Sequence, residues 1–567
     1  MAAVSSLWVR LRSPFWVARI VGLVGAVTLF SAVLPSIRSR TEVITQILPA
    51  VFPAAAATGA AALGLILIAL SRALRRGKYR AWVLATVLSA VTVVLHLVKG
   101  LDVEEALLSL GLFVLLLSAR KGFTAQPDPR SAGRLAGVLV VGPLVATVLG
   151  WLWLMIDADG QAPGTTVLER LAQAFLGLVG ISGPVQFVDP ADEALAAVAL
   201  VVLGASVVLL AVLAALQPAG GPHPLTDEER DRLGTVLEKW GGIDSLSYFA
   251  LRDDRSVIFS PSCKAAITYR VVGTVSLAAG DPIGDPEAWP GAIAAWLGEA
   301  KSFGWVPAVL AASERGAEAF HRVGLDALEL GDEAILHHDD FSLEGRSMRG
   351  VRQAVSRCNR AGLAVSCSRV SDLDAATLAD VRAKAEEWRD GEVERGFSMA
   401  LGRLGSPVDA RSVLVLSRDE AGVLRGLLHF VPWGNDGLSL DLMRRDRASE
   451  NGIVEQMVAG LMGSACELGV KRVSLNFAVF RSVFARGERL GAGPVLRIWR
   501  SVLLAASRFW QIESLYRANA KYQPEWVPRF ICFRSSADLP RVGVAALRAE
   551  AFLVAPAWLQ RFTSLWD

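Results

Sequence analysis

The feature that most constrains this chain is a series of long apolar segments, free of charge, that precede Gln217. A helix that crosses a bilayer needs about 20 mostly apolar residues, because lipid offers no partner to backbone polar groups. Segments of this kind are Ile20–Leu34, Ile47–Leu70, Ala81–Val98, Leu135–Ile156 and Ala194–Leu216. The shorter Ala106–Ser118 is counted as a further span, whereas Val167–Ile181 is interpreted as an interfacial or re-entrant helix. The sequence therefore predicts an α-helical membrane domain of about six spans over residues 1–217.

Loop charges predict the direction of these spans. Arginines and lysines gather before the first span, between the second and third, and between the fourth and fifth. Such basic loops remain in the cytoplasm, so the N-terminus and, after an even number of spans, everything beyond Gln217 are expected there. No Lys, Arg or Asp lies in the middle of a span, where such residues mark transport routes. A membrane anchor, with or without a lipid-access groove, is favoured over a pump.

Beyond the linker 218–229, in which Thr226 and Glu229 form a capping box, strands and helices alternate. Expected strands are Ser256–Ser260, Ala265–Val271, Val275–Ala279, Val306–Ala311, Ala334–His338, Ser412–Leu416, Leu424–Val431, Leu438–Leu442 and Arg472–Phe477. Expected helices are Glu287–Phe303, Arg315–Val323, Ser347–Ala361, Ala375–Arg389 and Ile453–Leu468. A similar order of elements occurs twice, which predicts two α/β lobes, 230–365 and 366–567.

The rest of the composition excludes several classes of site. The five cysteines are scattered without a C-x-x-C pair, and the six histidines have no H-x-x-x-H spacing. We therefore expect neither a structural zinc nor a disulfide framework, and no metal or other cofactor. The net charge of +3 is too small to indicate a polyanion partner by itself, so charge has to be examined locally.

The helix Ser347–Ala361 carries the clearest local charge pattern. At 3.6 residues per turn its arginines share one broad face, opposite an apolar face that docks; these arginines are Arg349, Arg352, Arg357 and Arg360. A solvated basic face is one interpretation. Phosphate binding is the other, with either tRNA or anionic lipid headgroups as ligand.

Two further stretches place charged residues at defined positions of predicted elements. Asp441 and Arg444 interrupt the end of the apolar strand Leu438–Leu442, where an ion pair between strand and helix is the plainer interpretation. Arg517 and Lys521 lie four residues apart and so share a helix face, which Pro524 ends. The Gly-rich GDPIGD at Gly280–Asp285 lacks the Lys-Ser/Thr ending of a P-loop and is interpreted as a structural turn.

These residues carry a family likeness. The part of the chain after Gln217 resembles the aminoacyl-phosphatidylglycerol synthases, the multiple peptide resistance factor family of bacterial membrane proteins. The matching stretches are GDPIGD, GDEAILHHDDFSLEGRSMRGVRQAVSRCNRAG from Gly331, EEWRDGEVERGFSMALG from Glu386, LSLDLMRRD from Leu438 and LYRANAKYQPEWVPRF from Leu515. The resemblance implies a cytoplasmic pair of tandem N-acetyltransferase-like lobes. Longer relatives carry a flippase half or a fused lysyl-tRNA synthetase, and neither is expected here.

The resemblance also implies an activity. The family transfers an amino acid, commonly lysine or alanine, from aminoacyl-tRNA to the glycerol hydroxyl of phosphatidylglycerol, which lowers the negative charge of the bacterial cell surface and protects it from cationic peptides. It implies catalytic roles for Asp441 and Arg444, and with them Glu387 and Lys521, and a substrate-binding role for Arg517. The expected partners are aminoacyl-tRNA, phosphatidylglycerol in the membrane and a second copy of the chain.

Other functions remain open from the sequence. A membrane-anchored acyltransferase that uses acyl-CoA would need R/Q-x-x-G-x-G/A, to which NRAGLA at Asn359 comes closest. A Fem-type enzyme would use the same tRNA donor with a peptidoglycan precursor as acceptor. A transporter or scaffold would leave the basic helix face and the polar strand end unexplained.

Overall fold

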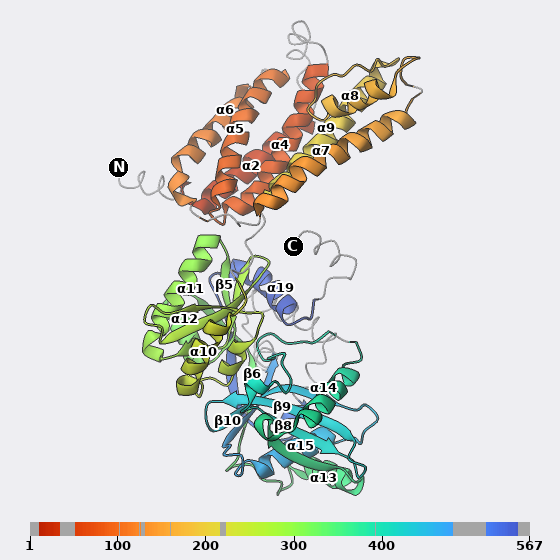
Figure 1. Ribbon diagram of the computed structural model, residues 1–567. Coiled ribbons are helices and arrows are strands. Elements are labelled where there is room, and N and C mark those ends of the chain that lie inside the picture. The colour runs from red at the N-terminus through yellow and green to blue at the C-terminus, as the bar shows by residue number, and fades with distance from the viewer. Residues whose placement is uncertain are drawn as a thin grey trace, which may run out of the picture. The chain divides into compact units, whose positions relative to one another are not determined.

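The computed structural model describes residues 11–33, 51–100, 103–123, 125, 131–158, 160–215, 223–391, 393–479 and 517–553. The chain divides into two compact units near residue 220 (Figure 1). This division coincides with the change from long apolar segments to mixed polar and apolar sequence. The two units are described in turn.

The N-terminal unit is a bundle of helices: α2 (Pro14–Val33), α4 (Val51–Leu74), α5 (Tyr79–Gly100), α6 (Val103–Ser118), α7 (Ser131–Ile156), α8 (Val167–Gly177) and α9 (Pro190–Ala215). Among the described residues, Leu135–Ile156 and Pro190–Ala214 are long and apolar enough to cross a membrane. Shorter apolar helices are Pro14–Phe30, Ala62–Leu74, Tyr79–Val94 and Ala106–Ser118. Two of the expected spans therefore have the necessary length, and the total of six stays a prediction.

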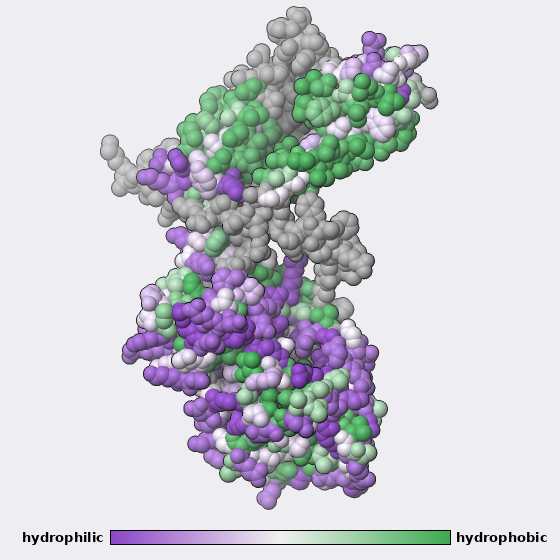
Figure 2. All heavy atoms as spheres, in the orientation of Figure 1, coloured by the Kyte–Doolittle hydropathy of each residue, from purple (hydrophilic) through white to green (hydrophobic). Residues whose placement is uncertain are grey.

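The packing of this bundle is that of a protein in lipid rather than water. Glycines allow α2 and α4 to approach closely, since a Cβ at Gly64 would lie 2.7 Å from the carbonyl oxygen of Gly25. Large apolar side chains such as Val140 and Leu144 of α7 point outward and are more than half exposed. Figure 2 shows hydrophobic side chains over the visible faces of these helices and mainly hydrophilic ones over the other unit. Such an apolar exterior requires a nonpolar surrounding.

The C-terminal unit is built on one continuous twelve-stranded sheet. Its strands are β1 (Ser256–Phe259), β2 (Ala265–Val272), β3 (Val275–Ala279), β4 (Ile283–Gly284), β5 (Val306–Ala312), β6 (Asp326–His337), β7 (Ala364–Arg369), β8 (Val413–Arg418), β9 (Leu424–Trp433), β10 (Gly437–Arg445), β11 (Arg472–Val479) and β12 (Glu525–Phe533). Its helices are α10 (Asp227–Trp240), α11 (Trp289–Phe303), α12 (Glu314–Arg322), α13 (Arg349–Arg360), α14 (Ala375–Arg389), α15 (Ile453–Ser464) and α19 (Leu539–Ala549).

The strand order is β1-β2-β3-β5-β12-β6-β11-β10-β9-β8-β7, with β4 paired to β2. β12, which is late in the chain, thus lies antiparallel between β5 and β6. β6 in turn pairs with β11, so the two lobes share one sheet. Arg529 of β12 is buried and holds this junction through ion pairs with Glu333 of β6 at 2.5 Å and with Asp244 at 2.7 Å.

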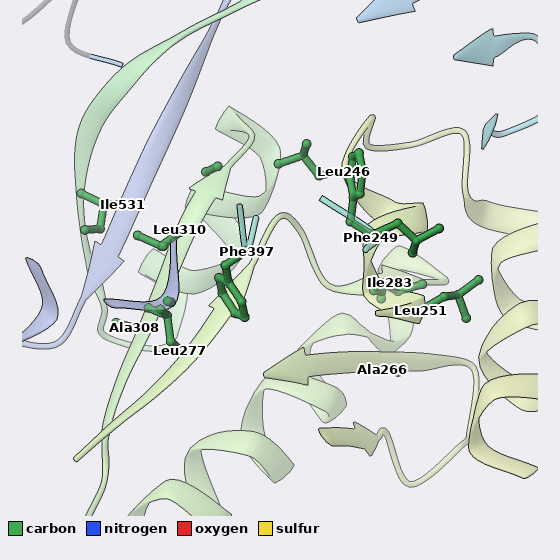
Figure 3. Close-up of a cluster of buried hydrophobic side chains, with 14 of the residues drawn as sticks. Leu246, Phe249, Leu251, Ala266, Leu277, Ile283, Ala308, Leu310, Phe397 and Ile531 are labelled. Carbon is green, nitrogen blue, oxygen red and sulfur yellow. The ribbon is translucent and has the colours of Figure 1, made fainter. Parts of the chain in front are cut away.

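Two hydrophobic cores correspond to the two lobes. The first packs strands β2, β3 and β5 with Ile531 of β12, Val542 of α19 and Phe397 from the loop after α14 (Figure 3). The second packs β8 to β11 and α15 with Val351 and Cys358 of α13. β6 contributes to both, through Leu330 to the first core and through residues 334 and 336 to the second.

This arrangement differs from the predicted lobes in two places. β12 and α19 were assigned to the second lobe, residues 366–567, but they complete the first core. α13 was assigned to the first lobe, residues 230–365, but it packs on α15 in the second core. The physical reason is that long-range strand pairing and helix docking decide membership of a lobe, and neither leaves a mark in local sequence.

Candidate active site

The site is centred on Asp441, which lies at an irregularity of β10. In the pairing of β10 with β9, Leu440 faces Phe430 and Leu442 faces His429, so Asp441 is an extra residue without a partner of its own in the ladder. A β-bulge of this kind bends the strand and redirects a side chain, and bulges are frequent next to active sites. The side chain of Asp441 is only 4% exposed.

Two hydrogen bonds hold the Asp441 carboxylate. The backbone N–H of Leu401 donates to Oδ1 at 2.5 Å, and Nδ1 of His429 lies 2.6 Å from Oδ2. His429 is completely buried, and its Nε2 has no partner among the described residues. If Asp441 is ionised, Nδ1 therefore carries the proton that is donated. A carboxylate offers about four lone-pair positions, so acceptor capacity for a ligand remains on both oxygens.

The loop that supplies Leu401 is fixed by the first lobe. Arg252 donates to the carbonyl oxygens of Gly396 and Ala400 at 2.7 and 2.8 Å. The buried Arg255 donates to the carbonyl oxygen of Phe397 at 2.5 Å, and burial lowers the pKa of its guanidinium to about 10. The Glu550 carboxylate accepts the N–H of Phe397 at 2.6 Å. The first lobe thereby positions the backbone that holds Asp441 in the second.

Arg444 lies three residues beyond Asp441 and is 17% exposed. Its guanidinium approaches the Glu394 carboxylate only to 3.9 Å, which is a loose ion pair. Asp441 and Arg444 both line two cavities, so the pair stands where these cavities adjoin.

The first cavity has a volume of about 200 Å³ and is strongly charged, with seven of its eleven lining residues ionisable. Those seven are Arg382, Glu386, Arg389, Glu394, Arg403, Asp441 and Arg444. Such a lining suits a small polar group that carries charge.

The second cavity is larger, about 610 Å³, and mainly apolar. Its apolar lining comes from several elements: Met399, Leu428, Leu440, Met443, Val454, Val458, Leu475 and Ala518. Arg445, Glu455 and Tyr522 also line it. Burial and the nearby Glu455 charge raise the pKa of the Tyr522 hydroxyl, so this group stays neutral. An apolar cavity with charge at one side fits an amphiphile.

The other predicted catalytic residues, and the substrate-binding Arg517, are placed differently. Lys521 is half exposed and its Nζ pairs with Glu455 at 2.7 Å, beside the apolar cavity. Arg517 is exposed and precedes the cavity-lining Ala518. Glu387 is on the exposed side of α14, where it pairs with Lys384 of the same helix at 2.8 Å. It lines neither cavity; its neighbour Glu386 does. The structure therefore does not bring Glu387 to Asp441, because the helical phase of α14 directs it elsewhere.

The four arginines on the predicted basic face of α13 differ in their contacts. Arg352 donates to the carbonyl oxygens of Leu343 and Gly345, and so closes the loop before the helix. Arg357 donates to the carbonyl oxygen of Asn451 at 3.0 Å and lies 3.4 Å from Glu450. Arg349 and Arg360 are exposed as well, and Arg360 donates only within its own helix, to the carbonyl oxygen of Ser356 at 3.3 Å. Arg352 and Arg357 thus hold neighbouring loops, whereas Arg349 and Arg360 present their charge to the surroundings.

GDPIGD belongs to the first lobe and not to the site. Gly280 has φ +73°, and the Asp281 carboxylate accepts the N–H and the hydroxyl of Ser313 at 2.8 and 2.5 Å. Burial, together with the charge of Asp244, raises the pKa of Asp281 to about 7. The geometry agrees with the interpretation of this stretch as a structural turn.

Sequence reasoning missed His429, Leu401 and the charged residues of α14. His429 gave no signal, since a single histidine in the apolar run LLHFVPW resembles a core residue. Leu401 acts through its backbone, which sequence does not reveal. No group of three or more His, Cys, Asp and Glu side chains in the described part of the chain could hold a metal ion.

Comparison with known proteins places this geometry in context. Residues 235–533 match the family described as phosphatidylglycerol lysyltransferase, C-terminal, and residues 10–216 match the transmembrane region of lysyl-tRNA synthetase. The lysylphosphatidylglycerol biosynthesis bifunctional protein LysX of Mycobacterium avium is 42% identical over 550 residues, which cover 94% of this chain and 46% of that protein. The protein of the same name from Mycolicibacterium gilvum is 43% identical over 549 residues, with 95% and 49% covered.

The solved structure of L-PGS from Bacillus licheniformis has a TM-score of 0.50 and 22% identity, and the match covers 57% of this chain and 97% of that one. This likeness supports the fold of the C-terminal unit. The chain spans about half the length of the curated relatives that it matches.

Fold and site together define a class, that of membrane proteins with an N-terminal transmembrane region and a C-terminal α/β unit whose two lobes share one sheet. The predicted order, a transmembrane region followed by an α/β unit, is confirmed, whereas the total of six spans and the N-acetyltransferase-like character of the lobes stay predictions. Within that class the match over 235–533 identifies the chain plainly: it belongs to the phosphatidylglycerol lysyltransferase family, as its motifs predict.

Proposed function

We propose that this protein transfers an aminoacyl group, lysyl or alanyl, from aminoacyl-tRNA to the glycerol hydroxyl of phosphatidylglycerol at the inner face of the bacterial membrane. The product would add positive charge to the lipid surface and reduce the binding of cationic peptides. Family membership and the printed names of the relatives support this choice.

One observation carries the proposal. A buried carboxylate, Asp441, and a partly buried guanidinium, Arg444, stand between a charged cavity and an apolar one. Transfer from tRNA to lipid needs this combination, since the aminoacyl group is small and cationic, while the acceptor is apolar apart from its phosphate and glycerol. The charged cavity would receive the aminoacyl group and the apolar cavity the upper part of the lipid chains.

The reaction exchanges one ester for another. The glycerol oxygen attacks the aminoacyl carbonyl carbon, the bond to the tRNA ribose oxygen breaks, and the hydroxyl proton passes to that ribose oxygen. Asp441, whose carboxylate is fixed by Leu401 and His429, would bind the ammonium of the aminoacyl group. Arg444 would bind the lipid phosphate or the terminal tRNA phosphate. Holding both substrates in place supplies much of the rate gain.

Further contacts would come from basic residues outside the cavities. We assign Arg349, Arg360 and Arg517 to phosphates of tRNA or lipid, because they are exposed. Lys521 would add positive potential beside the apolar cavity, where it is paired with Glu455. For Glu387 the geometry supports no catalytic role, since it lines neither cavity.

Reconstitution tests the activity. The purified full chain, in vesicles that contain both phosphatidylglycerol and a lipid-linked peptidoglycan precursor, is supplied with labelled lysyl-tRNA or alanyl-tRNA, and extracted lipid is analysed by mass spectrometry. Aminoacylated phosphatidylglycerol is the expected product. Label that moves only to a muropeptide-bearing lipid would favour the Fem-type function instead, and no transfer from either tRNA would remove the proposal.

The alternative of an acyl-CoA donor has less support in the geometry. The closest segment to a CoA motif, NRAGLA, lies at the C-terminal end of α13, where carbonyl oxygens rather than N–H groups are directed outward. The N-terminus of α15, which follows the bulged strand, carries Glu455 in its first turn. Acidic side chains there would repel a pyrophosphate. Binding of CoA to the purified protein, measured by calorimetry, is expected to be absent.

We also propose a multi-pass topology of about six spans, with the N-terminus and the C-terminal unit in the cytoplasm, as the basic loops predict. Cys263 and Cys466 are exposed in the C-terminal unit. A membrane-impermeant thiol reagent should label them in inverted vesicles and not in intact cells. Cross-linking in the membrane tests the expected second copy of the chain.

A further inference from the structure

The N-terminal unit contains a cavity that the transfer reaction does not explain. Its volume is about 1200 Å³, and it lies between α4, α5, α7 and α9, with the end of α8 also contributing. Every described residue that lines it is apolar or glycine except Arg80; the walls include Ile66, Val83, Leu139 and Val208. An apolar cavity of this size in a membrane region is expected to hold apolar matter rather than water.

The charge at this cavity is confined to one end. Arg80 is the second residue of α5, and it follows the turn that carries Arg75, Arg76 and Lys78. Arg80 is partly buried and is the charged residue among the described lining residues. Guanidinium groups bind phosphate in bidentate fashion, and basic positions between transmembrane helices are suited to anionic headgroups.

The length of the cavity corresponds to one leaflet. Along α9 its lining extends from Val201 to Val212, which at 1.5 Å per residue is about 17 Å. The hydrocarbon core of a bilayer is about 30 Å thick, so one leaflet contributes about 15 Å. A ligand with a single anionic end and an apolar body of this length is a glycerophospholipid.

We propose that this cavity binds one anionic phospholipid of a single leaflet, with its phosphate on Arg80 and its acyl chains along α5 and α9. The site is independent of the proposed transfer, and either can fail without the other. If both hold, the membrane region is a reservoir for the acceptor lipid as well as an anchor.

The charge of the site is tested by lipid retention. The full chain is purified in mild detergent from membranes that contain phosphatidylglycerol and phosphatidylethanolamine, and bound lipids are counted by native mass spectrometry. Arg80→Gln should lower the ratio of bound phosphatidylglycerol to phosphatidylethanolamine on the order of tenfold, the loss of one charged hydrogen-bonding partner. Arg72→Gln is the matched control, since Arg72 is exposed nearby and does not line the cavity. An equal loss in both variants would indicate general surface attraction and overturn the site.

The volume of the site is tested by filling it. Ala205→Phe on α9 projects a ring into the cavity and should remove bound lipid of both kinds. Val202→Phe on the same helix is the control, because Val202 is 51% exposed and lies outside the lining. If Ala205→Phe unfolds the protein, Val83→Phe on α5 makes the same test. Unchanged lipid content in the filled variants, or a change of oligomeric state in its place, would contradict the proposal.

Discussion

Replacement of His429 by leucine tests the geometry of the site most sharply. His429 is fully buried on β9, and its Nδ1 is 2.6 Å from Oδ2 of Asp441. Leucine fills a similar volume without a donor. The other ring nitrogen of His429, Nε2, has no partner among the described residues. The substitution therefore breaks one hydrogen bond and removes no other that the structure describes.

The magnitude follows from the charge of the acceptor. A hydrogen bond to a charged group contributes about 1.5–3 kcal/mol. A free-energy change of about 1.36 kcal/mol corresponds to a factor of ten in rate. If this hydrogen bond orients Asp441 for the transition state, its loss should therefore lower kcat/KM by roughly 10- to 150-fold. The N–H of Leu401 still holds Oδ1, so the activity should not vanish.

The assay is steady-state transfer from labelled aminoacyl-tRNA to phosphatidylglycerol vesicles. His429→Asn is the conservative control, because its amide N–H₂ is near the position of Nδ1 and should restore most of the activity. A leucine variant within twofold of the wild type would refute the positioning role of His429. An asparagine variant as impaired as the leucine variant, with both folded, would show that packing and not the hydrogen bond is responsible.

Three other predictions concern separate parts of the molecule. Glu386→Gln should reduce transfer on the order of tenfold, measured as kcat/KM, since Glu386 lines the charged cavity. Glu387→Gln should leave the rate unchanged, because that side chain is equally exposed on α14 but lines neither cavity. In a double-mutant cycle measured by thermal unfolding, Lys521→Ala and Glu455→Ala should show a coupling energy of no more than about 1 kcal/mol, because Lys521 is half exposed. If Lys521→Ala loses activity and the double variant does not recover it, Lys521 acts by contacting the substrate and not through its pair with Glu455. The free energy of unfolding should fall by a few kcal/mol as the pH rises from about 4 towards 7. Burial beside another carboxylate raises the folded-state pKa of Asp281 to about 7, so over this range the folded protein keeps a proton that the unfolded chain releases. Asp281→Asn should flatten this pH dependence in denaturant titrations.

Local sequence predicted the elements that local forces form. α14 begins and ends as expected, at Ala375 and Arg389, because Asp374 caps its start and Asp390 adopts the left-handed conformation at its end. β10 was expected as far as Leu442, but it continues to Arg445, since the charged residues after Asp441 still pair with β9. Charge inside an apolar run was enough to mark Asp441 as exceptional.

The main features that the sequence did not predict are formed by residues that lie far apart along the chain. The insertion of β12 between β5 and β6 joins residues nearly two hundred positions apart, as the bond between Arg529 and Glu333 shows. The resemblance pointed to Glu387, whereas its neighbour Glu386 lines the charged cavity, since one residue turns a side chain by about 100° around the helix axis. His429 was missed because its role exists only once the bulge at Asp441 is formed.

The central claim is that Asp441 and Arg444 form the centre of a tRNA-dependent lipid aminoacyltransferase. The most direct measurement compares the wild type with Asp441→Asn and Arg444→Gln, each folded and reconstituted, for transfer of labelled amino acid from tRNA to phosphatidylglycerol. Loss of at least about a hundredfold in kcat/KM for both variants is predicted. Transfer at the wild-type rate by either variant would contradict the account.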